Sequence, residues 1–198
     1  TSGGTEADNM AIHCAVNNLG VKHIVTSRIE HHAVGYTVEK MKSEGLVDLT
    51  YVHIDEKGHI DLQHLDQILA TRPKTLVSLM HANNEIGNLL PIELVSEICE
   101  KHGAIFHSDT VQTMSHYTFD MKVFDKIHFL ACSAHKFHGP KGVGFLYINK
   151  SVKVKPFIYG GSQERNMRGG TENIYGIVGL SKAMDIAYSN LMEHKEYI

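Results

Sequence analysis

The chain has 198 residues, of which 42% are hydrophobic and 21% are charged, and its formal net charge is -3. This length supports one substantial core and is short for two domains. The weak negative charge, with scattered Lys and Arg residues, disfavours binding to nucleic acid or to an anionic membrane surface. The longest apolar runs are far shorter than a membrane span, and we expect no signal peptide. We therefore expect a globular cytoplasmic protein.

Apolar β-branched runs alternate with amphipathic helical patterns along the chain. In chain order the patterns predict a helix over 7–19, a strand over 21–29, a helix over 33–43, a strand over 46–52, a helix over 62–70, a strand over 75–81, a helix over 92–102, strands over 104–109, 126–132 and 143–148, and one long helix over 174–198. This alternation predicts an α/β fold with a mainly parallel sheet and helices on both faces.

Both ends of the sequence are abrupt. The opening Thr1–Glu6 segment has the chemistry of a loop that leads into a helix, and the chain stops at Ile198 inside a helical pattern. We expect the sequence to be a piece of a longer protein.

Cysteine and histidine usage gives no metal signature. Cys14, Cys99 and Cys132 have no CxxC spacing, which favours reduced thiols over a disulfide framework or a zinc site. The chain has 15 histidines, but His31 and His32 are adjacent, so their side chains diverge, and there is no HExxH pattern. We expect no metal site.

Lys136 lies just after an apolar strand pattern and just before a Gly-Pro turn. The carboxyl ends of strands in alternating α/β proteins face the ligand crevice, so an amine at this corner is directed at a bound molecule. A lysine in that position is able to form a Schiff base.

Other polar residues follow strands that end at the same edge. Asp109 ends one strand and could keep a pyridine nitrogen protonated, although a helix cap is the alternative. His31 follows another strand and could stack on a planar ring, or could be purely structural. Residues 83–87 supply amide groups there, or simply form a turn.

Two loops of small residues each lead into a helix pattern. Residues 1–6 and 168–173 both suit an anion such as phosphate, and both are also explained as ordinary helix starts, with Ser2 or Thr5 as the cap residue of the first. His135 could be a proton relay or a phosphate donor, or could be merely packed. A lysine, an acid, a flat ring partner and anion donors at one sheet edge are the parts that a pyridoxal phosphate site needs.

Six segments, in order, resemble the signatures of one enzyme family. They are TSGGTEADN at 1–9, IEHHAV at 29–34, HANNEIG at 81–87, HSDTVQ at 107–112, SAHKFHGPKG at 133–142 and RGGTEN at 168–173. Together they resemble the cysteine desulfurases, pyridoxal phosphate enzymes of the class V aminotransferase family, in the subgroup that donates sulfur to nitrogenase and iron–sulfur clusters. The resemblance covers essentially the whole chain.

The resemblance implies that residues 1–198 form the cofactor-binding large domain of a fold-type I pyridoxal phosphate enzyme. It assigns catalytic roles to Lys136, which forms the Schiff base and moves the substrate α-proton, and to His31, which stacks on the ring. Asp109 would pair with the pyridine nitrogen. The remaining cofactor contacts would be Gln112 and Asn84 on the phenolic oxygen side, Gly4, Thr5, Ser133 and His135 on the phosphate, and Thr171 on the phosphate of a neighbouring subunit, which implies a homodimer.

One departure from the family pattern concerns the sulfur-accepting cysteine and the arginine that holds the substrate carboxylate. Both lie downstream of the RGGTEN segment in the family, and Cys14, Cys99 and Cys132 match no such position. We expect these three thiols to be buried and inert. The chain is therefore expected to bind the cofactor without desulfurating.

The expected reaction of the parent protein is conversion of L-cysteine to L-alanine, with the sulfur left as a persulfide for a sulfur-acceptor or scaffold protein. One alternative is a selenocysteine lyase or another enzyme of the same family. An alternative of another class is a non-catalytic binding module on the same scaffold.

Overall fold

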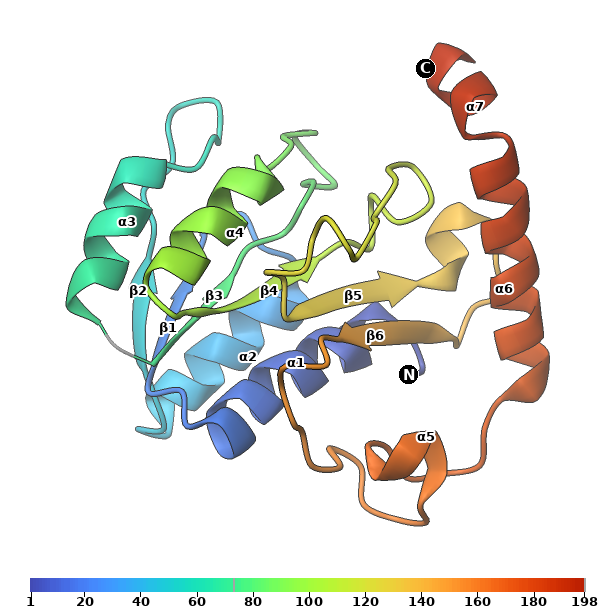
Figure 1. Ribbon diagram of the computed structural model, residues 1–198, viewed down its shortest axis with the longest axis horizontal. Helices are drawn as coiled ribbons and strands as arrows, with labels where there is room; N and C mark the ends of the chain where they lie inside the picture. The colour runs from blue at the N-terminus through green and yellow to red at the C-terminus, as the bar shows by residue number, and fades with distance from the viewer. Residues whose placement is uncertain (73, 198) are drawn as a thin grey trace.

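A six-stranded sheet with the order β2-β1-β3-β4-β5-β6 forms the centre of the computed structural model, which describes residues 1–72 and 74–197 (Figure 1). The strands are β1 (His23–Thr26), β2 (Asp48–Tyr51), β3 (Thr75–Ser78), β4 (Ile105–Asp109), β5 (Phe129–Ser133) and β6 (Gly144–Ile148). Strands β1 to β5 pair in parallel, and β6 is antiparallel to β5. The prediction of a mainly parallel sheet is confirmed.

Helices cover both faces of the sheet, as predicted (Figure 1). The helical elements are α1 (Gly4–Leu19), α2 (His32–Ser43), α3 (Leu62–Thr71), α4 (Ile92–Lys101), the 3₁₀ helix η1 (Ala134–Phe137), α5 (Gln163–Asn166), α6 (Ile174–Ser189) and α7 (Leu191–Tyr197). Helices α1 and α2 lie on one face, and α3 and α4 lie on the other. Helix α6 contacts η1 beyond the β6 side of the sheet.

Neighbouring residues of each strand face different hydrophobic clusters. Ile24 and Leu76 pack with Val34 beneath α1 and α2, whereas Val25 and Val77 belong to the cluster beneath α3 and α4. Side chains alternate across a strand, and both faces are covered here, so every position of the inner strands β1, β3 and β5 is buried. This explains why the strands have continuous apolar runs in the sequence.

The prediction of one helix over 174–198 is wrong. Helix α6 ends at Ser189, and Asn190 has the non-helical angles φ -107° and ψ 15° before α7 begins. Asn competes with the helical backbone through its own side-chain hydrogen bonds, which favours a break there. Ile198 lies outside the described residues. The observed strands are also shorter than most of the predicted ranges.

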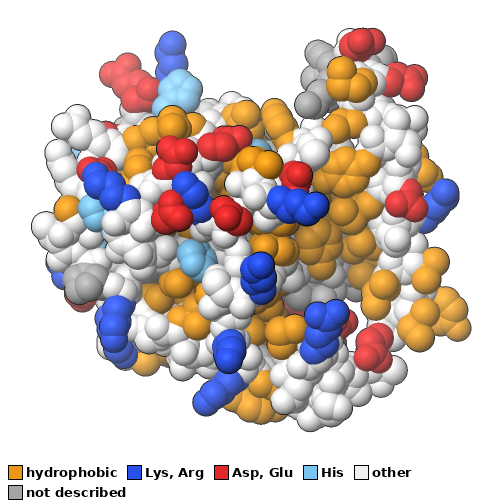
Figure 2. All heavy atoms as spheres, in the orientation of Figure 1, with side chains coloured by type: hydrophobic (Ala, Val, Ile, Leu, Met, Phe, Trp, Pro, Cys, Tyr) orange, Lys and Arg blue, Asp and Glu red, His pale blue; other side chains and the backbone are white. Residues whose placement is uncertain are grey.

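Helix α6 carries an exposed apolar strip. Ile174, Tyr175 and Val178 are 63%, 91% and 63% exposed, and Figure 2 shows hydrophobic side chains gathered along this side of the molecule. A continuous strip of this kind is typical of a surface that packs against another protein surface. Within the described ranges, no helix is both long and apolar enough to cross a membrane.

Gly144, the first residue of β6, allows the N-terminal loop to lie against the sheet. Its N–H donates to the Thr1 carbonyl at 3.0 Å, and the Thr1 amino group donates to the Gly144 carbonyl at 3.1 Å. A Cβ atom at position 144 would overlap the Cys132 carbonyl oxygen and lie 2.8 Å from the Gly3 Cα. The absence of a side chain therefore lets the residues before α1 lie against β6.

We expect Gly144→Ala to lower the free energy of unfolding by about 2 kcal/mol or more, because overpacking against backbone forces a shift of the chain. Gly35→Ala in α2 is the matched control, since a Cβ there meets open space. That change should raise stability by roughly 0.5 kcal/mol through helix propensity. Urea unfolding of both variants measures the difference, and equal stabilities would contradict the role given to Gly144.

Candidate active site

A cavity of about 210 Å³ lies at the carboxyl ends of the parallel strands. Every residue that the sequence assigned to the cofactor, except Thr171, lines it. Its lining consists of Gly4, Thr5, Asp8, His31, Met80, Asn84, Asp109, Val111, Gln112, Ser133, His135 and Lys136. The strand ends and the first turn of α1 thus bring together residues from positions 4 to 136.

Asp109 is the acid of this cavity. It ends β4, is 6% exposed, and its Oδ1 accepts the Val111 N–H at 2.8 Å. The carboxylate therefore bonds the turn that follows the strand, and no helix begins there. Burial raises the pKa of Asp109 to about 7, and the negative charge of Asp8 adds to this rise.

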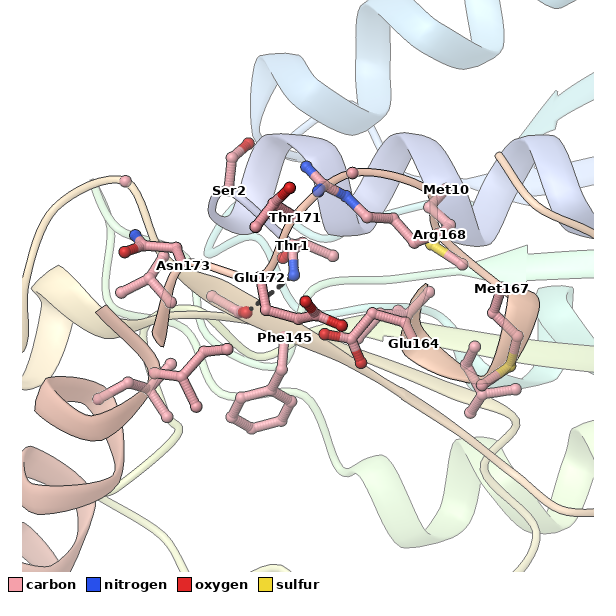
Figure 3. Close-up of a pocket in the computed structure, with 18 residues that line it drawn as sticks. Thr1, Ser2, Met10, Phe145, Glu164, Met167, Arg168, Thr171, Glu172 and Asn173 are labelled. Atoms are coloured by element: carbon pink, nitrogen blue, oxygen red, sulfur yellow. Dashed lines mark hydrogen bonds between the residues drawn. The ribbon is translucent and has the colours of Figure 1, made fainter. Parts of the chain in front are cut away.

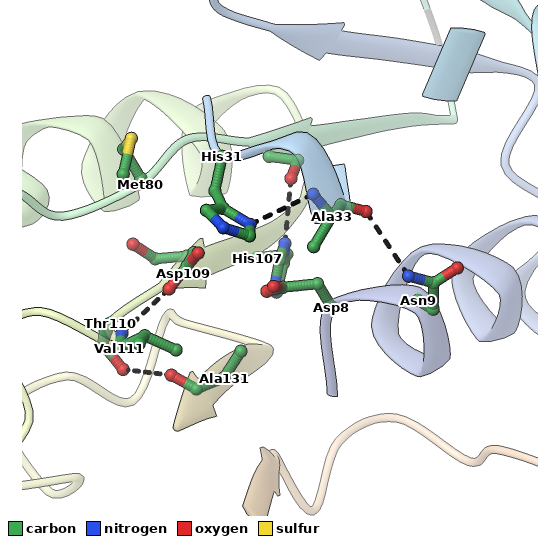
Figure 4. A network of polar contacts seen from close by, with 12 residues as sticks. Asp8, Asn9, His31, Ala33, Met80, His107, Asp109, Thr110, Val111 and Ala131 are labelled. Atoms are coloured by element: carbon green, nitrogen blue, oxygen red, sulfur yellow. Dashed lines mark hydrogen bonds and ion pairs between the residues drawn. The ribbon is translucent and has the colours of Figure 1, made fainter. Parts of the chain in front are cut away.

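His31 has the structural role that the sequence offered as one alternative, and it also lies at the cavity. It is the N-cap of α2, where its Nδ1 accepts the Ala33 N–H at 3.1 Å, and it also lines the cavity. With Nδ1 as the acceptor, the proton of the neutral ring lies on Nε2. Figure 4 shows the ring beside Asp109. The cap fixes the imidazole at the cavity wall.

Lys136 and His135 lie in η1, directly after β5, and both side chains are exposed. His135 Nδ1 is 2.8 Å from Ser133 Oγ, so these two polar groups act as a pair. Lys136 lines the same cavity as Asp109. The predicted placement of a lysine at a strand-end corner is confirmed.

The start of α1 lacks the side-chain cap that was one of the two alternatives for this loop. Gly3 is the N-cap residue and makes no side-chain cap hydrogen bond, so neither Ser2 nor Thr5 caps the helix. The first N–H groups of a helix have no intrahelical partner, and they attract anions. A Cβ on Gly4 would lie 2.6 Å from Val111 Cγ2, so glycine lets this backbone form the cavity wall.

Thr171 lines a different and larger cavity of about 420 Å³ (Figure 3). Near Thr171, Arg168 Nε donates to Glu6 Oε1 at 2.9 Å. Burial alone would raise the pKa of Glu6, but the hydrogen bonds from Arg168 and Ser2 outweigh it and lower this pKa to about 2. Asn173 caps α6 by accepting the Gly176 N–H. The 168–173 loop thus has a helix-start structure, with its arginine in an ion pair.

Sequence reasoning missed the buried pair of His107 and Asp8, of which Asp8 lines the cavity. His107 Nε2 lies 3.4 Å from Asp8 Oδ1, and His107 Nδ1 lies 2.9 Å from Ser78 Oγ (Figure 4). Burial raises the pKa of Asp8 well above its usual range and lowers that of His107 to about 4. The spacing of these residues could have indicated the pair. Asp8 is one helical turn beyond Thr5, and His107 is two strand positions before Asp109, so each shares a face with a predicted site residue.

The cysteines lie away from this cavity's lining, as free and buried thiols. Burial raises the pKa of Cys14 to about 11, and it also raises the pKa values of Cys99 and Cys132. The prediction that the three thiols are buried is confirmed. Across the described part of the chain, no group of three His, Cys, Asp or Glu side chains is placed to hold a metal ion.

Known proteins similar to the chain include cysteine desulfurases. A cysteine desulfurase IscS of Clostridium botulinum (strain Hall) is 45% identical over 198 residues, which is 99% of this chain and 49% of that protein. The cysteine desulfurase IscS of Methanosarcina thermophila is 45% identical over 196 residues, 98% of this chain and 48% of that protein. The chain therefore spans about half the length of the curated relatives it matches.

Solved structures share the fold. A NifS-like protein superposes with a TM-score of 0.90 at 40% identity, covering 98% of this chain and 53% of that one. A structure described as SspA in complex with cysteine has a TM-score of 0.86 at 37% identity, covering 93% of this chain and 54% of that one. These likenesses confirm the predicted α/β fold.

The model of the family described as aminotransferase class-V matches residues 1–196. This match covers nearly the whole chain, including every strand of the sheet and every residue of the cavity lining. The chain therefore belongs to the aminotransferase class-V family.

Proposed function

We propose that the protein is a pyridoxal phosphate-dependent cysteine desulfurase and that these 198 residues form its cofactor-binding domain. The observation that carries the proposal is one cavity lined by Lys136, Asp109 and His31 beside the open first turn of α1. Relatives named as cysteine desulfurases support it. The reaction would convert L-cysteine to L-alanine and leave the sulfur as a persulfide on an enzyme cysteine, for transfer to an acceptor or scaffold protein in iron–sulfur cluster or thiolation pathways.

The lining fits pyridoxal phosphate, which when bound supplies an electron sink conjugated to the substrate α-carbon. Lys136 Nζ would bind the aldehyde carbon and, once released by the substrate amine, would take the α-proton. The Asp109 carboxylate would hold the proton at the ring nitrogen. Its burial suits this role, because a cation at the ring nitrogen offsets the cost of a buried anion.

Phosphate donors would come from two sides of the cavity. The backbone N–H groups of Gly4 and Thr5 at the start of α1 and the Ser133–His135 pair supply hydrogen bonds to an anion. His31 would cover one face of the ring. Two amide side chains, Asn84 and Gln112, would orient the phenolic oxygen side of the cofactor and the substrate.

We propose that Thr171 and α6 contact a second subunit. Thr171 lies outside the 210 Å³ cavity, which agrees with a role toward the phosphate of a partner subunit. The exposed apolar strip on α6 supports a homodimer. Free cysteines support a reducing compartment such as the cytoplasm.

The sulfur-accepting thiol is not assigned to Cys14, Cys99 or Cys132. The thiolate is the nucleophile in such chemistry, and burial raises the pKa of all three thiols. We infer that the accepting cysteine, like the arginine that holds the substrate carboxylate, lies outside these 198 residues.

Lys136→Ala tests the cofactor site. Purified protein mixed with pyridoxal phosphate should show a visible absorption band that survives dialysis, and this band should be absent in Lys136→Ala because the covalent link is lost. Lys141→Ala, which removes another exposed lysine nearby, should keep the band. A wild-type protein that stays colourless with excess cofactor would favour the non-catalytic binding module.

The reaction class is tested on the full-length protein. Incubation with L-cysteine and a thiol reductant should release L-alanine and sulfide in equal amounts, because each turnover cleaves one C–S bond. A higher kcat/KM for L-selenocysteine than for L-cysteine would favour a selenocysteine lyase instead. Absence of alanine from a protein with bound cofactor would contradict both reactions.

Thiol reactivity tests the exclusion of the three cysteines. In the native state Cys14, Cys99 and Cys132 should react with a disulfide reagent at least about 100-fold more slowly than a free thiol, because burial keeps them protonated and inaccessible. All three should react on unfolding in guanidinium chloride. Mass spectrometry of the labelled peptides identifies each site, and rapid native labelling of any of the three would contradict the exclusion.

A further inference from the structure

Two loops at the edge of the cavity are joined by reciprocal hydrogen bonds. From the loop after β1, the Glu30 carboxyl accepts the Met80 N–H, with N···O distances of 3.1 Å to Oε1 and 2.9 Å to Oε2. From the loop after β3, Asn83 Nδ2 donates to the Ile29 carbonyl at 2.6 Å. Each loop thus supplies one side chain that bonds the backbone of the other.

The next residue along each loop lines the cavity. His31 follows Glu30 and Asn84 follows Asn83, and both belong to the lining of the 210 Å³ cavity. Glu30 and Asn83 themselves line a separate hollow of about 160 Å³. The loop contacts therefore lie one residue away from the side chains that would meet the ring and the substrate.

Local contacts make this junction rigid. Ser27 Oγ donates to Glu30 Oε1 at 2.6 Å, and Asn83 Oδ1 accepts the N–H groups of Glu85 and Ile86 at 2.7 and 2.9 Å. Loss of hydration raises the pKa of Glu30 to about 8, because this effect is larger than the opposing effect of the hydrogen bonds from Ser27 and Met80. Glu30 is half-buried, and a carboxyl with these donors is costly to leave unpaired there, so the contact resists opening.

We propose that Glu30 is a positioning residue that acts through His31: its contact with Met80 holds the loop after β1 against the loop after β3, and so holds the imidazole at the cavity wall beside Asp109. The proposal rests on the proposed function, because the ring that His31 would cover is that of pyridoxal phosphate. Side chains on loops keep a productive geometry only when neighbouring contacts fix them. The α2 cap at Ala33 fixes the imidazole from one side, and the Glu30 contact fixes the loop from the other.

A double-mutant cycle tests this route of action. Glu30→Ala, His31→Ala and the double variant are titrated with pyridoxal phosphate, well below their unfolding temperatures, and the Kd and the visible circular dichroism of the bound cofactor are measured. We expect Glu30→Ala to raise Kd about tenfold in the wild-type background and less than about twofold in the His31→Ala background, because residues that act as one unit are not additive. The dichroism of Glu30→Ala should shift toward that of His31→Ala.

Two further variants control for structure. Glu30→Gln retains an oxygen for the Met80 N–H and an amide that donates to Ser27, so its Kd should stay within about twofold of wild type. Glu85→Ala, an exposed acid on the loop after β3, should also have no effect. If Glu30→Ala does not fold, the cycle is run with Glu30→Asp, whose shorter side chain does not reach Met80.

The outcomes separate the two proposals. An equal rise in Kd with and without His31, or an unchanged Kd and dichroism in folded Glu30→Ala, would overturn the positioning role while leaving the cofactor site intact. Failure of the wild-type protein to bind pyridoxal phosphate would instead contradict the proposed function on which the role rests.

Discussion

Parallel pairing of β1 to β5 brings the carboxyl ends of these strands to one edge of the sheet, and the candidate site depends on this arrangement. Parallel neighbours require a crossover connection, so each strand end is followed by a loop before the chain turns back. His31 follows β1, Asp109 ends β4 and Lys136 follows β5, and all three line one cavity. The antiparallel return of β6 then brings Gly144 to Thr1 and seats the start of α1 at the same edge.

Burial gives this edge its electrostatic character. Asp109 and Asp8 are almost fully buried, and His107 lies beneath them with no exposed surface. Burial disfavours the charged form of each group, which raises the carboxyl pKa values and lowers that of the imidazole. A cation at the ring nitrogen of a bound cofactor would relieve this cost at Asp109. Burial also raises the pKa values of the three thiols, which lie elsewhere in the core, and so disfavours their thiolate forms.

Loops supply five of the twelve lining residues, namely His31, Met80, Asn84, Val111 and Gln112, and specific contacts tie these and other loops to the scaffold. Glu30 and Asn83 join two of the loops, and the Glu6–Arg168 ion pair joins the first turn of α1 to the segment before α6. Such contacts matter because loops are otherwise the most mobile parts of a fold. In this molecule His31, Asn84 and Thr5, each next to one of these contact residues, line the cavity.

Sequence patterns predict the α/β fold and the alternation of strands and helices along the chain, because hydrophobic periodicity is local. They also predict His31, Asp109 and Lys136 at one sheet edge, because polar residues that end or follow parallel strands lie there. Gly4, Ser133 and Gln112 are assigned instead by the family resemblance. Only the tertiary structure decided the break at Asn190, the open start of α1 and the separation of Thr171 from the main cavity. The Glu30–Met80 contact, which spans 50 residues of chain, and the Asp8–His107 pair also emerged only there. Such contacts join segments that no local pattern relates, and they exist because packing places two polar groups where water does not reach them.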